Sequence, residues 1–140
     1  MWRLYSSSNE SICIQTTSRK LRQSMPAGID IGTVQYIDYE TEWVPERQPV
    51  LPFLYKRKSF EHEREFRAIG NILDPSTNDL RQEESENGLW IKCELEDLIE
   101  RVRVAPDVAP WFRDLVVQTV NKYELNIPVE PSSLELKPLR

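Results

Sequence analysis

The sequence predicts an α+β fold in which one sheet, mostly antiparallel or mixed, is packed by about three helices. Short segments with alternating apolar residues follow one another along the chain, and three segments with helical spacing are interposed between them. The 140 residues are most simply one domain, residues 1–140, and are enough to bury most of the surface that the unfolded chain exposes. Hydrophobic residues make up 39% and charged residues 29%, which is typical of a globular protein.

The first half of the chain is predicted to hold strands around one short helix. Thr17 or Ser18 can cap a helix that ends at Ser24, because Pro26 and Gly28 follow directly. Residues 11–16 favour a buried strand. Three prolines between residues 40 and 52 indicate a surface loop. The strands expected in this half are residues 2–5, residues 11–16 with Ile12 and Ile14 inward, and residues 33–39.

The second half is predicted to contain further strands and the longest helix. Residues 74–87 carry five carboxylates and one arginine, so we expect a polar, mobile segment there. Asp107 can cap the longest helix, with Pro110 in its first turn. The strands expected are residues 88–95, 102–105 and an edge strand at residues 129 and 134–136, with a short helical turn at residues 95–100. One apolar stripe on the long helix is expected to comprise Val108, Phe112, Leu115, Val116, Thr119 and Tyr123.

The most distinctive segment is residues 56–67, in which nine of the twelve side chains are ionisable, including the only histidine. Residues 53 to about 63 can form a helix, and residues 66–69 have the pattern of a strand. A change from helix to strand is therefore expected inside this charged run. Such a run either solvates one face of an element or builds a site from carboxylates held beside cations.

In an extended segment, side chains alternate across the sheet, so Glu63, Glu65 and Arg67 would share one face. Arg67 could hold Glu65 ionised, whereas burial of two neighbouring carboxylates would raise the pKa of one of them. A carboxyl group with a raised pKa can act as a general acid or base, and an ionised one can orient a ribose hydroxyl. Glu63 and Glu65 are therefore the candidate catalytic residues, while Lys56, Arg57 and Arg67 are candidate ligands of an anion. If the segment is helical instead, Glu63 faces Arg67 one turn away on a solvated surface.

Composition excludes several classes of protein. The net charge of −5 argues against a general nucleic-acid coat, because phosphate binding needs a basic surface. No apolar run approaches the roughly 20 residues of a membrane span. Only Cys13 and Cys93 are present, and both lie in alternating apolar contexts that favour buried, reduced thiols in a cytoplasmic protein. Two cysteines and one histidine without short spacing give no zinc signature.

The charged run resembles the signature of a large bacterial and phage family of uncharacterised proteins, the family of domain of unknown function 2971. The shared pattern is Lys-Arg-x-x-Phe-x-x-Glu-x-Glu-x-Arg at residues 56–67, and residues 1–5, 12–17, 34–39 and 104–106 agree as well. This resemblance covers most of the chain and implies a bacterial or phage origin, but no reaction. Members usually carry a segment before the Met-Trp start, which this chain lacks. Either the chain is a compact member, or its reading frame begins partway through the domain. The second alternative would leave a site incomplete and a sheet edge uncovered, and association with another copy, as a homo-oligomer, or with another chain would cover that edge.

A second resemblance is to ADP-ribosyltransferases of the arginine, Ser-Thr-Ser, Glu-x-Glu class, which bind NAD. Arg3, the hydroxyl-rich residues 16–18 and the pair Glu63 and Glu65 occur here in that order. The resemblance implies that Glu65 steadies the ribose while the nicotinamide bond stretches, that Glu63 helps the acceptor, and that Arg3 holds a phosphate.

Three hypotheses for function remain open at this point. The first is an anion-handling or partner-handling site around Lys56, Arg57, Glu63, Glu65 and Arg67. The second is a transferase that uses NAD, and the third is a structural module in which these residues form a buried ion network. An enzyme would place both glutamates at the bottom of a pocket, whereas a structural module would pair each carboxylate. The sequence names neither a cofactor nor a partner.

Overall fold

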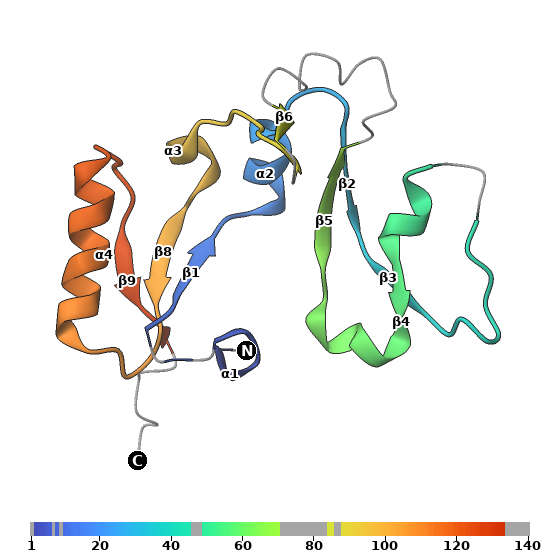
Figure 1. Ribbon diagram of the computed structural model, residues 1–140, viewed down its shortest axis with the longest axis horizontal. Coiled ribbons are helices and arrows are strands. Elements are labelled where there is room, and N and C mark those ends of the chain that lie inside the picture. Colours follow the sequence, from blue (N-terminus) through green and yellow to red (C-terminus); the bar gives the residue numbers. More distant parts are fainter. Residues whose placement is uncertain are drawn as a thin grey trace. The chain divides into compact units, whose positions relative to one another are not determined.

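The structure, a computed structural model, describes residues 2–6, 8, 10–45, 49–70, 84–85 and 88–133. The chain divides into two compact units, of which unit 1 comprises Met1–Ser24 and Cys93–Arg140 and unit 2 comprises Met25–Lys92. Helices and strands both occur along the described chain, which confirms the α+β class (Figure 1). The described strands form one three-stranded sheet and three two-stranded ladders, so the expectation of a single sheet is wrong.

Unit 1 is built on the three-stranded sheet, whose order is β1-β8-β9. Its strands are β1 (Ile12–Gln15), β8 (Arg101–Val104) and β9 (Val129–Pro131). β1 pairs with β8 antiparallel, and β8 pairs with β9 parallel. Val102, Val104, Ala105 and Ile127 are buried in this unit, and Val104 is 0% exposed. The alternation of Arg and Val in β8 therefore places valines in the core and arginines on the opposite face.

The helices of unit 1 are α1 (Trp2–Tyr5), α2 (Ser18–Ser24), α3 (Leu95–Leu98) and α4 (Pro110–Lys122). The hydroxyl of Thr17 accepts a hydrogen bond from the Lys20 amide at 3.2 Å, which confirms Thr17 as the cap of α2. Pro110 is the first residue of α4, as predicted, because its missing N–H needs no partner there.

Unit 2 consists mainly of two ladders. β2 (Ile29–Thr33) pairs antiparallel with β5 (Phe66–Gly70), and β3 (Gln35–Ile37) pairs parallel with β4 (Tyr55–Arg57). A further ladder joins β6 (Glu84–Ser85) to β7 (Gly88–Leu89). Two 3-10 helices flank β4, namely η1 (Leu51–Leu54) before it and η2 (Lys58–Glu63) after it. Among the described residues of unit 2, the buried apolar ones are Val34 and Ile37.

Several predicted elements are wrong in type or length. Residues 2–5 form the helix α1 rather than a strand, closed by a hydrogen bond from the Ser6 amide to the Trp2 carbonyl at 2.9 Å. The helix predicted from residue 53 to about 63 is divided into η1, β4 and η2, because residues 55–57 pair with β3. The strand predicted at residues 33–39 is two strands, interrupted at Val34, whose amide donates to the Glu65 carbonyl at 3.0 Å.

The second half of the chain brings further corrections. In the strand predicted at residues 88–95, only β7 has strand structure, and α3 already begins at Leu95. Asp107 does not cap α4, since it has a left-handed backbone (φ 60°) and Ala109 occupies the cap position. On α4, Phe112 and Val116 are half-buried as expected, but Leu115 and Tyr123 are exposed.

Burial of β1 was also predicted wrongly. Ile12 and Ile14 are 48% and 57% exposed, because β1 lies at the edge of its sheet. Cys13 is exposed as well, so its predicted burial is wrong, whereas Cys93 is half-buried; both thiols are free. The polar segment predicted at residues 74–87 lies outside the described residues except for β6, and so does the strand predicted at residues 134–136.

Among the described residues, no helix is long and apolar enough to cross a membrane.

Candidate functional site

Four charged side chains of unit 2 form one ion cluster, which we call the Lys56 cluster. The Lys56 ammonium donates to Glu63 Oε2 at 2.5 Å and to Glu65 Oε1 at 2.6 Å. Arg67 Nε donates to the second carboxylate oxygen of Glu65 at 2.8 Å. The four side chains keep 19–31% of their surface exposed, so the cluster is largely but not fully covered. It joins β4, the end of η2 and β5.

The backbone around Glu65 fixes the position of this carboxylate. The Glu65 amide donates to the Tyr36 hydroxyl at 2.7 Å, and its carbonyl accepts from the Val34 amide at 3.0 Å. Arg67 is anchored at its far end, because its Nη1 donates to the Phe53 carbonyl at 2.6 Å. The backbone of Glu65 and the side chain of Arg67 are thus both held by hydrogen bonds to other parts of unit 2, so the cluster is preorganised.

The chain reaches this geometry through a sharp turn at Arg64. Arg64 has a left-handed backbone (φ 47°) and ends η2, with its amide donating to the Glu61 carbonyl at 3.3 Å. This turn brings Glu63 from a 3-10 helix and Glu65 from extended backbone to the same ammonium. Their bound oxygens are therefore at most about 5 Å apart, close enough to repel without the lysine.

Hydrogen bonds in the cluster set the protonation states. Hydrogen bonds from Arg67 and then Lys56 lower the pKa of Glu65 from 4.5 to about 2. Hydrogen bonds to Glu63 and Glu65 raise the pKa of Lys56, and the hydrogen bond to Glu65 raises the pKa of Arg67. Glu65 is consequently ionised at neutral pH, and its two oxygens are occupied by cations. It is poorly suited to exchange a proton with a substrate near pH 7.

The sequence predicted part of this cluster correctly. Glu65 and Arg67 face each other as expected for residues two apart in an extended segment, and Arg67 holds Glu65 ionised. Glu63 joins them through Lys56 from η2, so the prediction that it shares an extended face with them is wrong. The expected rise in the pKa of one buried carboxyl does not occur at Glu65, because two cations outweigh its desolvation.

Two other predicted site residues lie outside the cluster. Arg57 points away from it and lies over the Tyr39 ring, with 5.8 Å between the guanidinium carbon and the ring centroid. Arg3 belongs to α1 in unit 1, and its side chain is not among those that the structure describes. Sequence reasoning missed the hydroxyl of Tyr36, although its place in an alternating segment was the available signal.

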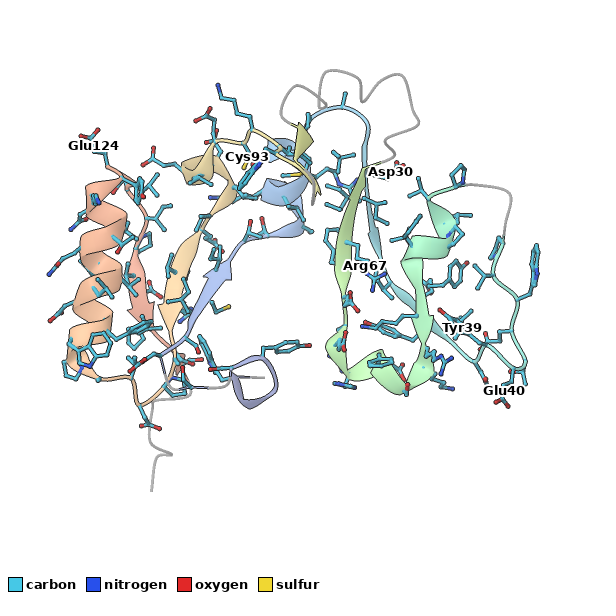
Figure 2. All side chains as sticks on the ribbon, viewed as in Figure 1. Asp30, Tyr39, Glu40, Arg67, Cys93 and Glu124 are labelled. Atoms are coloured by element: carbon cyan, nitrogen blue, oxygen red, sulfur yellow. The ribbon has the colours of Figure 1, made fainter. Side chains whose placement is uncertain are left out.

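A cavity of about 330 Å³ opens at the carboxyl ends of the parallel strands β3 and β4. Its charged and polar lining comes from two short segments, residues 38–40 after β3 and residues 57–59 at the end of β4 and the start of η2. Tyr39 and Glu40 lie on the turn that follows β3, whereas Arg67 lies on β5 (Figure 2). The complete lining is Ile37, Asp38, Tyr39, Glu40, Arg57, Lys58 and Ser59.

Two consecutive residues of β4 belong to the Lys56 cluster and to the cavity, respectively. Side chains alternate along a strand, so Lys56 points into the ion cluster while Arg57 lines the cavity.

Over the described part of the chain, no group of three or more His, Cys, Asp or Glu side chains is placed to hold a metal ion.

Comparison of the chain with models of protein families, with curated proteins and with solved structures gave no match. The resemblance to the family of domain of unknown function 2971 therefore stays a prediction, as does the resemblance to ADP-ribosyltransferases.

Proposed function

We propose that unit 2 is a binding module of a cytoplasmic bacterial or phage protein, and that it holds a phosphorylated, hydroxyl-rich small molecule in the cavity beside Arg57. The observation that supports the proposal is the position of this cavity, at the carboxyl ends of β3 and β4. Ligands of proteins with parallel strands commonly bind just beyond those ends. A volume of about 330 Å³ also suits a small ligand.

The lining favours a ligand with two kinds of polar group. Arg57 and Lys58 offer cationic donors that suit a phosphate, and Ser59 adds a hydroxyl. Asp38 and Glu40 offer carboxylate acceptors that suit the hydroxyls of a sugar. A sugar phosphate or a nucleotide carries both groups, whereas a simple anion would meet the two acids without benefit.

The Lys56 cluster acts in this proposal as the support of the site. Its ion pairs hold β4, η2 and β5 together, and β4 in turn carries Arg57 at the cavity wall. Lys56, Glu63, Glu65 and Arg67 then stabilise the binding geometry without touching the ligand. This assignment joins the structural-module hypothesis to the binding-site hypothesis, because adjacent residues of one strand perform the two tasks.

The cluster geometry weighs against the NAD-transferase hypothesis. A glutamate that steadies a ribose accepts hydrogen bonds from its hydroxyls, but each oxygen of Glu65 already accepts one, from Lys56 or from Arg67, which reduces its remaining capacity to accept. If NAD binds nevertheless, the melting midpoint of the protein must rise at millimolar NAD.

Titration of the full chain with ribose 5-phosphate, followed by calorimetry and by amide NMR shifts, tests the proposal. We expect saturable binding that shifts the amides of Tyr39 and Arg57. Arg57→Gln should weaken binding at least tenfold and lower the melting midpoint only slightly, because Arg57 makes no ion pair among the described residues and its contact with the Tyr39 ring is weak. Inorganic phosphate should bind more weakly than the sugar phosphate.

The matched control is Lys122→Gln, which removes one positive charge from α4. It should leave binding unchanged, and an equal loss in this variant would mean that only net charge matters. Absence of any saturable binding by the wild-type protein would overturn the proposal.

A further inference from the structure

Unit 1 has a cavity of its own, with a volume of about 460 Å³. This volume lies within the range of roughly 300–1,000 Å³ that is usual for small-molecule sites. The wall is formed by α1 and the residues that follow it, by β1 and β8, and by the residues that follow β9. All lining residues belong to unit 1, and none belongs to the site proposed above.

Part of the cavity wall is apolar and aromatic. Trp2, Tyr5 and Ile12 line it, and Ile12 belongs to the exposed edge strand β1. The Trp2 indole is held in place because its Nε1 donates to the Ser132 hydroxyl at 3.1 Å. Two aromatic rings favour a planar apolar group as the ligand.

The cavity wall also carries a cation. Among the described residues that line it, Arg103 is the only Arg, Lys, His, Asp or Glu. Its guanidinium is oriented by bonds from Nε to Gln15 Oε1 at 2.8 Å and from Nη1 to the Pro131 carbonyl at 3.3 Å. A fixed guanidinium, as the one charged group of the described lining, favours a single negative charge on the ligand.

The nearest carboxylate does not neutralise Arg103 fully. Glu130 lies 3.6 Å from Arg103 Nη1, but both of its oxygens accept hydrogen bonds from Arg101, at 2.9 and 3.1 Å. Two arginines thus share one carboxylate on this face of the sheet. Glu100 accepts from Gln15 at 3.4 Å rather than from either arginine, and it does not line the cavity.

We propose that this cavity binds a small monoanion made of one aromatic ring and one carboxylate. The ring packs against Trp2 and Tyr5, and the carboxylate pairs with Arg103. Cys13, whose thiol is free and which is exposed, also lines the cavity. A bound ligand therefore shields Cys13, which gives an independent reporter of occupancy.

Phenylacetate is the probe for this proposal, because phenylacetamide and phenethylamine are its neutral and cationic analogues. In NMR titrations of the full chain, phenylacetate should shift the indole N–H signal of Trp2 and leave that of Trp111, which does not line the cavity. The two analogues should bind at least tenfold more weakly. Equal affinity for the acid and the amide, or an unshifted Trp2 signal, would overturn the proposal.

Arg103→Gln should weaken phenylacetate binding at least tenfold, while Arg113→Gln on the exposed side of α4 should not change it. Equal losses in both variants would refute a specific pairing.

Since Arg103 also bonds within the sheet, the wild-type protein provides a test that needs no variant. Saturating phenylacetate should slow alkylation of Cys13 by iodoacetamide at least fivefold and leave Cys93 unaffected, and an unchanged Cys13 rate would count against occupancy of this cavity.

Discussion

Replacing Glu65 by glutamine should remove a defined part of the acid sensitivity of unit 2. The pKa of Glu65 is lowered from 4.5 to about 2, mainly by the hydrogen bond from Arg67 and next by that from Lys56. A carboxyl with a lowered pKa in the folded state stabilises that state above its unfolded pKa, and this stabilisation is lost as the pH falls toward the folded value. The relevant window is therefore about pH 4.5 down to about pH 2.

The magnitude follows from proton counting. Near the middle of this window Glu65 is ionised in the folded state and protonated in the unfolded state, so unfolding takes up close to one proton at this residue. Glu65→Gln has no proton to take up. Its stability should thus fall less steeply with decreasing pH than that of the wild type, although it is the less stable protein at pH 6.

The assay is urea unfolding at pH 2.5, 3.5, 4.5 and 6, followed by the NMR amide signals of residues 29–70, which report on unit 2. Wild-type and variant midpoints should converge as the pH falls, with unchanged denaturant slopes. Glu61→Gln is the matched control, because Glu61 lies in the same charged run, is exposed and makes no ion pair among the described residues. If the Glu65→Gln and wild-type midpoints run parallel from pH 6 to 2.5, the ion cluster does not hold Glu65 as described.

Three further outcomes are expected. The carboxylate partners of Lys56 raise its pKa, so the stability that Lys56 contributes to unit 2 should be lost only above about pH 10.5, as the pH passes the pKa of the folded state. Lys56→Met should lack this alkaline loss in urea titrations. Val104→Ala should lower the free energy of unfolding by about 2 kcal/mol in urea melts, since Val104 is fully buried, and an unchanged midpoint would contradict its core position. Gly32→Ala should cost about 1–2 kcal/mol, because the new methyl would lie 2.9 Å from Leu54 Cδ1, and Leu54→Ala should relieve much of this penalty; Gly70→Ala, with 3.2 Å to its nearest atom, is the milder control.

Residues close in sequence determined their own geometry. The spacing of Glu65 and Arg67 was enough to predict that they face each other, because alternation along an extended chain needs no other element. The positions of Thr17 as the cap of α2 and of Pro110 as the first residue of α4 were also predicted from residues adjacent in sequence. The α+β class also followed from the order of periodic segments.

Pairing between distant segments decided the rest. Nothing within residues 53–63 indicates that Tyr55–Arg57 pairs parallel with β3, yet that pairing breaks the predicted helix and directs Lys56 and Arg57 to opposite sides. Edge and centre positions in a sheet have similar sequence patterns, so the exposure of Ile12 and the burial of Val104 could not be distinguished beforehand.

The sequence by itself thus determined which charges are adjacent along the chain and, where the signal lies within a few residues, how a helix such as α2 or α4 begins. Only the tertiary structure decided that one lysine binds two glutamates, that Tyr36 receives the Glu65 amide, and which side chains line the two cavities. The physical reason is that local preferences act over a few residues, whereas each of these contacts closes a longer loop whose ends are fixed by packing and strand register.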